Sequence, residues 1–318
     1  MGEEVHADFH HLARKVSNWG RWGREDQRGA LNLITPEVLK RAGAAVRQGK
    51  LFRLGLDFAF DGPQFRTGPV ARLNPRLYMT KVGHVLAPAA GDYAASDDVI
   101  HMPTQCATQW DAFGHVQYGG KLYNGFDAAA SITTDGACRC GIEHAASPGI
   151  LSRGVLLDIA RLKGVGRLAG DVIITPDDLD AACRAERVEV ERGDIVLVRT
   201  GHIAWFTRDR NIAVFGAAQP GLSMHCALWL RDRDVAAVAA DNSAVEQLPL
   251  SLFRPGEVPL PLHMLCLRDM GLILGELFDF DALAEDCASD GVYSFLLSAP
   301  ALPIRGAVGS PINPLALK

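Results

Sequence analysis

The sequence predicts an α/β fold in a single domain, and three observations support this prediction. Short apolar runs rich in branched residues recur along the chain and are typical of strands buried on both faces. These runs are Leu51–Phe60, Gly154–Ile159, Ile195–Arg199, Val235–Ala240, Leu272–Leu277 and Val292–Leu297. Helical stretches alternate with some of them, at Leu222–Arg231 and Asp281–Glu285. No internal repeat or Pro/Ser-rich linker divides the 318 residues, so we expect an N-terminal extension over residues 1–34 and one domain over residues 35–318.

Two helix starts are marked by local sequence. Thr35-Pro36-Glu37 combines a hydroxyl cap, a proline at the first helical position and an acid near the positive end of the helix dipole. Thr175-Pro176-Asp177-Asp178 repeats the signal. The first thirty residues show no clean period, and we expect them to pack over the domain without forming a core element. The long stretch Asp61–Ala95 contains Gly, Pro and Asn, which is typical of a functional loop or an edge hairpin.

Composition excludes several classes of function. The chain has 48% hydrophobic and 22% charged residues and a net charge of -5, which gives no electrostatic reason to bind nucleic acid or an anionic membrane surface. No apolar run reaches the roughly 18 residues that cross a bilayer, and the acidic start Met1–His6 is not a secretory signal. Seven cysteines, an odd number without paired spacing, favour reduced thiols. We therefore expect a cytoplasmic protein.

The run from Gln105 to His115 gathers side chains suited to metal binding or proton transfer. In an extended backbone, Gln105, Gln109, Asp111 and His115 would share one face, while Thr108 and Trp110 would turn to the other. A straight strand of ten steps would span about 33 Å and could not close a site. We therefore expect a bend near Gly114 and a second one, of helical type, between Gln105 and Gln109.

This run resembles the signature of the cyclase-like metal-dependent hydrolases, the family of bacterial kynurenine formamidase and isatin hydrolase. The family pattern is His-x-Gly-Thr-His-x-Asp-x-Pro-x-His. Thr108, Asp111 and His115 match it, whereas Gln105 and Gln109 stand at the two leading His positions. Further segments resemble the family over nearly the whole chain: residues 19–23, 29–32, 193–201, 240–246, 262–263, Glu276 and 306–311. The resemblance implies the swivelling β/β/α architecture of that family.

The resemblance also implies a site. His115 matches the family's proton-transfer residue, and its ordinary pKa near 6.5 suits acid/base work. Asp111, His263, Gln105 and Gln109 would hold a divalent metal ion, with Glu276 sharing the ion or orienting His115. Amide oxygens bind Zn²⁺ more weakly than imidazole does, and oxygen ligands suit harder ions such as Mn²⁺ better. We therefore expect Mn²⁺ or Zn²⁺, with Mg²⁺ as a further candidate. The alternative is a site without metal, in which the two amides hydrogen-bond the substrate.

Other polar and aromatic residues have two interpretations each. Trp19, Trp22 and Trp205 are candidates to wall a pocket for a ring-bearing substrate, or they pack in the core. Trp110 is a further candidate substrate contact. His202, after a predicted strand, and Asp241, Ser243 and Glu246, after another, are candidate pocket residues because sheet sites lie at strand ends. Acids in such places also serve as helix caps.

We expect a hydrolase that opens an amide, lactam or lactone bond of a small organic molecule, with a metal-activated water and His115 as general acid and base. A cyclase, dehydratase or isomerase that uses the same groups is one alternative, and a metal-free protein that only binds a small ligand is another. The expected partners are a small-molecule substrate and further copies of the chain, in a homodimer or homotetramer. Neither nucleic acid nor a membrane is expected.

Overall fold

A nine-stranded mixed sheet forms the centre of the protein. The computed structural model describes residues 2–64, 71–87, 91, 93–249 and 257–318. The strand order is β1-β15-β13-β7-β9-β11-β12-β4-β14. The strands are β1 (Leu51–Arg53), β4 (Gln109–Asp111), β7 (Leu151–Asp158), β9 (Ile195–Arg199), β11 (Ala237–Ala240), β12 (Ile273–Glu276), β13 (Ser294–Ser298), β14 (Gly309–Pro311) and β15 (Leu315–Leu317). The mixed α/β class and the single domain predicted from the sequence are confirmed.

The middle of the sheet is parallel and its flanks are antiparallel. Strands β7, β9, β11 and β12 run parallel to one another, whereas β13 joins β7, and β4 joins β12, in antiparallel pairs. Three further two-stranded pieces stand outside this sheet. They pair β2 (Arg76–Ala87) with β3 (Tyr93–His101), β5 (Ile132–Thr133) with β6 (Gly136–Ala137), and β8 (Ile173–Ile174) with β10 (Gly221–Leu222).

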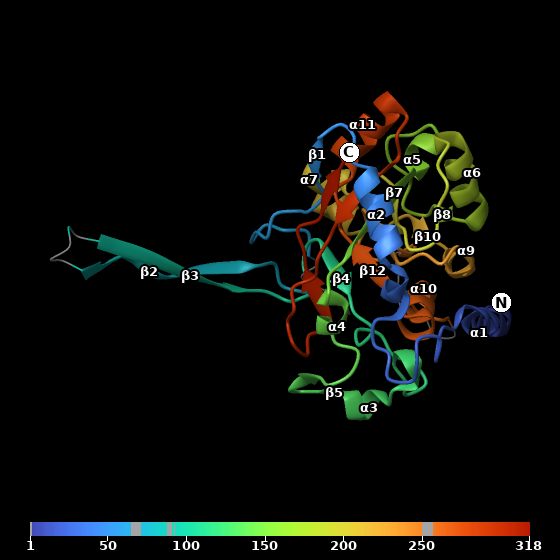
Figure 1. Ribbon diagram of the computed structural model, residues 1–318, viewed down its shortest axis with the longest axis horizontal. Helices are drawn as coiled ribbons and strands as arrows, with labels where there is room; N and C mark the ends of the chain where they lie inside the picture. Colours follow the sequence, from blue (N-terminus) through green and yellow to red (C-terminus); the bar gives the residue numbers. More distant parts are fainter. Residues whose placement is uncertain (1, 65–70, 88–90, 92, 250–256) are drawn as a thin grey trace.

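Helices pack on the sheet (Figure 1). Helix α2 packs on β7 and β13, α6 on β7, and α5 on β9 and α6. The α-helices are α1 (Gly2–Val16), α2 (Pro36–Ala44), α3 (Ala128–Ser131), α4 (Glu143–Ala146), α5 (Ile159–Leu162), α6 (Pro176–Glu186), α7 (Ala204–Thr207), α8 (Ile212–Phe215), α9 (Cys226–Asp232), α10 (Pro261–His263) and α11 (Asp281–Asp290). The described residues also include two 3₁₀ turns, Gly29–Leu33 and Tyr123–Gly125, and a π-helix, Met264–Met270.

The two predicted helix starts are confirmed. Thr35 caps α2 by accepting a hydrogen bond from the backbone N–H of Val38. At α6, Thr175 and Asp178 form a reciprocal capping box. These caps satisfy backbone donors that the first turn of a helix leaves without partners.

The N-terminal segment contradicts the expectation that it lacks a core element. Residues Gly2–Val16 form a helix that packs against α9 and the π-helix. Its buried side chains are Phe9, Leu12, Ala13 and Val16, which recur at the three- and four-residue spacing of one helix face. This spacing can be read in the sequence, but it covers only about two helical turns.

The first predicted strand is shorter than expected. Only Leu51–Arg53 pair with β15, although the apolar pattern continues to Phe60. Beyond Arg53 the backbone follows other partners, because Leu54 donates to the carbonyl of Pro314 and Leu56 to the hydroxyl of Thr108. Likewise, the predicted helix Leu222–Arg231 begins only at Cys226, since Leu222 lies in β10 and pairs with Ile174 of β8.

The stretch Asp61–Ala95, within its described part, enters a long hairpin that projects from the body of the molecule (Figure 1). Strands β2 and β3 pair only with each other. Nearly every described residue of the two strands is exposed. The hairpin is therefore an arm and not an edge of the central sheet.

Strand β4 lies between β12 and β14, and its register with β12 determines which side chains of the two strands lie opposite each other. Gln109 faces Glu276, Trp110 faces Gly275, and Asp111 faces Leu274. Trp110 is fully buried, and its ring packs against Phe278. A Cβ atom on Gly275 would lie 2.6 Å from both the Cβ of Ala239 and Cζ3 of Trp110. The close approach of β11, β12 and β4 therefore requires glycine at this position.

Gly275→Ala is expected to lower the free energy of unfolding by about 1–3 kcal/mol, because the added methyl group overpacks a rigid interior. Denaturant unfolding measures this change. Gly166→Ala is the control, since a Cβ atom there meets nothing within 4 Å. Equal stability of the two variants would contradict the packing described for Gly275.

Candidate functional site

The polar face of β4 and β12 provides the first part of the site. Side chains alternate along a strand, so Gln109 and Asp111 point to one side and Trp110 to the other. Glu276 is the cross-strand neighbour of Gln109 on the same side. The amide nitrogen of Gln109 donates to Oε2 of Glu276 at 2.6 Å and lies 3.5 Å from Oδ1 of Asp111. All three side chains are buried.

His263 brings the imidazole of the group. It ends the short helix α10, which continues directly into the π-helix. Glu246, from the loop after β11, holds the start of this helix by accepting hydrogen bonds from the backbone N–H groups of Leu262 and His263. The same carboxylate lies 2.6 Å from Nδ1 of His263. The contact with Glu246 at Nδ1 thus fixes the orientation of the His263 ring, and the other ring nitrogen, Nε2, faces β4 and β12.

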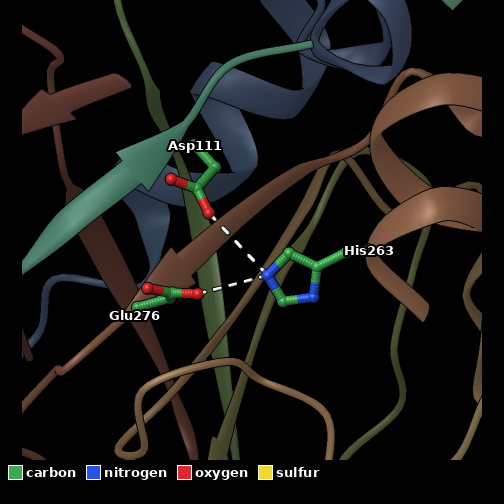
Figure 2. A group of neighbouring side chains, drawn as sticks. All are labelled: Asp111, His263 and Glu276. Atoms are coloured by element: carbon green, nitrogen blue, oxygen red, sulfur yellow. Dashed lines mark hydrogen bonds and ion pairs between the residues drawn. The ribbon is translucent and has the colours of Figure 1, made fainter. Parts of the chain in front are cut away.

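Asp111, His263 and Glu276 converge on one point (Figure 2). Nε2 of His263 lies 3.2 Å from Oε1 of Glu276 and 3.9 Å from Oδ2 of Asp111. One ligand atom from each residue lies within 4.8 Å of the other two. Ligand atoms about 2.1 Å from a tetrahedral ion are about 3.4 Å apart, so these separations match a shared cation.

Burial makes the charges of this group mutually dependent. Burial would by itself lower the pKa of His263, but the hydrogen bonds and charges of Glu246 and Glu276 raise it to about 10. Burial raises the pKa of Asp111; the charge of Glu276 adds to this, while His115 and His263 oppose it. A carboxylate in such a place is stabilised by a positive charge.

The residues present fit a divalent cation. Oδ2 of Asp111 is buried and has no hydrogen-bond donor, although it faces the cluster. A buried carboxylate oxygen without a partner is costly unless a cation or a donor meets it. Two carboxylates and one imidazole are ligands that Zn²⁺ and Mn²⁺ accept, and Glu246 behind His263 is the acid that often orients a ligating imidazole.

The two glutamines lie differently from their predicted role as ligands. Gln109 turns its amide nitrogen toward Glu276, so in this arrangement it positions a carboxylate and does not offer its oxygen to the cluster. The Oε1 atom of Gln105 accepts a hydrogen bond from Thr104, and its amide packs where a side chain on Gly309 would stand. No hydrogen bond joins Gln105 to the described acids of the site. The bend between the glutamines is also not helical; it is made by Ala107 at a φ of 55°.

His115 lies beside the cluster, past the second bend. The chain turns after Asp111, where the N–H of His115 donates to the carbonyl of Ala112. Nε2 of His115 is 4.0 Å from Oδ1 of Asp111 and 3.5 Å from Nη2 of Arg72. Burial lowers the pKa of His115, Asp111 opposes that change and Arg72 adds to it. A neutral imidazole that can accept a proton therefore faces the same space as Asp111.

A cavity of about 340 Å³ opens onto these groups. His115, His263 and Glu276 form its polar wall, and Arg72 and Gln64 lie along it. The rest of the lining is mostly apolar or small: Pro63, Ala71, Val116, Ser243, Ala244, Leu248, Leu260 and Leu277. Cavities of this size and character bind small organic molecules.

Of the predicted substrate contacts, three require correction. Trp110 is fully buried on the opposite face of β4, and its Nε1 donates to the carbonyl of Ala299. Asp241 is buried and accepts hydrogen bonds from the backbone of Thr200 and Gly201, so it ties the ends of β9 and β11 together. His202 packs on the ring of Phe215 and contacts its carbonyl oxygen. None of the three lines the cavity.

The remaining tryptophans also lie outside the cavity. Nε1 of Trp19 donates to the carbonyl of Arg268, whose guanidinium lies 4.4 Å from the centre of the Trp19 ring. Trp22 packs partly buried against the main core, with Arg21 over its ring. Both therefore fasten the N-terminal segment to the body of the protein.

Two residues of the site escape assignment from the sequence. Glu246 follows a strand end, which is a signal for a site, but the sequence does not show that it lies behind His263. Arg72 lies in the predicted long loop with no motif around it. Only the folded chain brings it to His115.

Comparisons with known proteins agree with this architecture. The family model described as "Putative cyclase" matches residues 25–247. A crystal structure described as a novel cyclase is 39% identical, with a TM-score of 0.84 and coverage of 95% of this chain and 100% of its own. Isatin hydrolase A from Labrenzia aggregata, bound to benzyl benzoate, has a TM-score of 0.62 at 18% identity, covering 86% of this chain and 94% of its own.

A predicted metal-dependent hydrolase from Bacillus stearothermophilus has a TM-score of 0.50 at 16% identity, covering 85% of this chain and 98% of its own. These more distant structures share the fold. No curated protein matches the sequence significantly. Among the described residues, no helix has the length and apolar character needed to span a bilayer. The match over most of the chain to the family model and to the 39% identical structure shows that the chain belongs to the cyclase family.

Proposed function

We propose that the protein is a metal-dependent hydrolase that opens an amide, lactam or lactone bond of a small organic substrate. The observation that carries the proposal is the convergence of Asp111, His263 and Glu276 beside His115. His115, His263 and Glu276 line one cavity, and Asp111 lies buried behind them. The isatin hydrolase that shares the fold and the predicted metal-dependent hydrolase are in keeping with this class of reaction.

Asp111, His263 and Glu276 would hold a divalent ion, with Mn²⁺ or Zn²⁺ favoured by the mixed nitrogen and oxygen donors and Mg²⁺ possible. When bound, such an ion supplies Lewis acidity, which polarises a carbonyl group and lowers the pKa of a water molecule. Gln109 holds Glu276 by its hydrogen bond, and Glu246 holds His263. Both contacts keep the donor atoms aimed at one point.

His115 moves the proton. Its lowered pKa leaves the imidazole neutral near pH 7, so Nε2 can accept a proton from water as the water oxygen bonds to the substrate carbonyl carbon. His115 then returns the proton to the leaving nitrogen or oxygen as the bond to the carbonyl carbon breaks. Asp111, 4.0 Å away, stabilises the imidazolium between the two transfers.

We also propose a homodimer or homotetramer built with the β2–β3 arm. Nine large apolar side chains of the arm are exposed: Leu77, Tyr78, Met79, Val82, Val85, Leu86, Tyr93, Val99 and Ile100. A two-stranded hairpin alone in water is marginally stable, and an apolar surface of this kind marks an interface. The apolar arm needs a partner wherever the chain folds, and a second copy of the chain is always present there.

All seven cysteines are free. Unpaired thiols in this number support our proposal of a cytoplasmic location.

A panel of lactams, lactones and N-acyl amines, incubated with metal-loaded protein in H₂¹⁸O, tests the reaction class. Hydrolysis adds one water and places one ¹⁸O in the product carboxylate. Products of unchanged mass, or mass lowered by one water, would support an isomerase or a dehydratase instead.

His115→Ala is expected to lower kcat by about 10²–10⁴-fold, because a positioned acid/base group contributes on this order, while the Kd of a non-hydrolysed substrate analogue changes little. Steady-state kinetics and calorimetric titration measure the two quantities. His144→Ala, on α4 and outside the cavity, is the control. Equal losses in turnover and in binding would contradict the role given to His115.

Glu246→Gln is expected to weaken metal binding by about 10–100-fold, the range typical for a residue that orients a ligating histidine. Calorimetric titration of metal-free protein with Mn²⁺ or Zn²⁺ measures the affinity without a substrate. Glu285→Gln is the control, since Glu285 is largely exposed and pairs only with Arg161 at the surface. An unchanged affinity in Glu246→Gln would remove Glu246 from the site.

Val82→Asp combined with Leu77→Asp is expected to shift the protein toward monomer, because both side chains are exposed on the arm, at 78% and 63%. Sedimentation velocity measures the change, and circular dichroism checks that the body stays folded. Val165→Asp, at an exposed turn away from the arm, is the control. A wild-type protein that is monomeric at micromolar concentration would contradict the interface.

A further inference from the structure

Arg72 is a fixed positive charge at the wall of the cavity. It lies in the segment that leads into β2, half-buried, and its Nη2 reaches Nε2 of His115 at 3.5 Å. A guanidinium has five N–H donors and no acceptor. Within the described part of the chain this one long contact uses a single donor, and no carboxylate pairs directly with the guanidinium, although Arg72 and the buried Asp111 interact through their charges.

Three partly buried arginines outside the cavity are each matched by acids. Arg153 pairs with Asp194 and Glu191, Arg199 with Asp158 and Asp281, and Arg268 with Asp269. Among the described residues, no carboxylate lies within ion-pair distance of Arg72. The arginine at the cavity thus differs from those that hold the fold together.

A second donor on the same wall also lacks a partner. Gln64 is buried, and its backbone N–H is bound to the side chain of Asn74, but its amide Nε2 has no hydrogen-bond acceptor. Leaving a buried donor unpaired costs about 1–3 kcal/mol in general. Gln64 and Arg72 line the same cavity. The amide nitrogen of Gln64 is covered in this arrangement, so it would reach an entering acceptor after a rotation of its side chain.

We propose that Arg72, assisted by Gln64, forms a subsite for a carboxylate carried by the substrate. This inference rests on the proposed hydrolase and narrows its substrates to lactams, lactones or amides that bear an acid group. The planar fork of a guanidinium matches the two oxygens of a carboxylate. Asp111, Glu246 and Glu276 are already close, so a singly charged carboxylate is repelled less than a doubly charged phosphate.

The contact with His115 gives the subsite a second consequence. Arg72 lies beside the proton-transfer group, so a substrate anchored through its carboxylate is held with its neighbouring atoms against His115. Anchoring of this kind places the reacting carbonyl and lowers the entropy lost on the way to the transition state. Arg72 is thus a positioning residue that selects the substrate.

Binding of the matched probes benzoate and nitrobenzene, neither of which carries an amide, lactam or lactone bond, tests the subsite apart from turnover. Wild-type, metal-loaded protein is expected to bind benzoate about 10–100-fold more tightly than nitrobenzene, the range of a charge-assisted hydrogen-bonded pair. In Arg72→Gln this preference is expected to fall to about 2-fold. Arg72→Lys keeps the charge but loses the fork, and should retain part of the preference.

Arg76→Gln is the matched control, since Arg76 is exposed at the base of the arm and does not line the cavity. Equal affinity of wild-type protein for both probes would overturn the subsite. If Arg72→Gln keeps the preference for benzoate, benzoate binds the metal and not Arg72, which overturns the subsite. Tighter binding of phenylphosphonate than of benzoate would overturn the choice of a carboxylate as the ligand. If benzoate binds as expected but no member of the substrate panel is hydrolysed, the subsite stands and the proposed reaction fails.

Discussion

The burial of three acids around one imidazole is the constraint on which the site depends. Asp111, Glu246 and Glu276 are all nearly inaccessible to water, and each needs a positive group or a donor to offset the loss of hydration. Glu246 obtains two backbone N–H groups and His263, whereas Glu276 obtains Gln109 and His263. Oδ2 of Asp111 accepts no hydrogen bond, and Nε2 of His263 lies 3.9 Å from it. The protein thus holds a focused negative charge at one wall of a mostly apolar cavity, which is the physical basis for a cation site there.

The sheet makes this arrangement rigid. The register between β4 and β12 places Gln109 and Glu276 directly opposite each other, and a shift by one residue would send both glutamine and aspartate into the core. Trp110 and Gly275 interlock on the other face of the same strands and so resist such a shift. The sequence predicts Trp110 as a substrate contact. In the structure, Trp110 contributes to the site by fixing the register between β4 and β12.

Much of the architecture is predictable because it follows from local patterns. Continuous apolar runs predict the parallel strands, and Thr-Pro-acid sequences predict the starts of α2 and α6. Strand alternation places Gln109 and Asp111 together, and the family resemblance adds His263 and Glu276. What escapes prediction depends on contacts between distant segments. The roles of Glu246 and Arg72 arise from the folded loops around the cavity. That of Asp241 arises from hydrogen bonds between the ends of β9 and β11, and that of His202 from its contact with Phe215 in α8. The helical spacing of the apolar residues between Phe9 and Val16 is present in the sequence, but it is too short to stand out.

Gln105 and Gln109 give the chain its distinct character, since they replace two imidazoles of the family pattern by neutral amides. In the folded protein Gln109 supports an acid, and the candidate ligands are Asp111, His263 and Glu276. The most direct test is a crystal structure of the protein grown with Mn²⁺, with anomalous diffraction recorded at a wavelength where manganese scatters. The account predicts a single strong anomalous peak within about 2.0–2.4 Å of Oδ2 of Asp111, Nε2 of His263 and a carboxylate oxygen of Glu276. A peak located elsewhere, or none at saturating Mn²⁺, would contradict it.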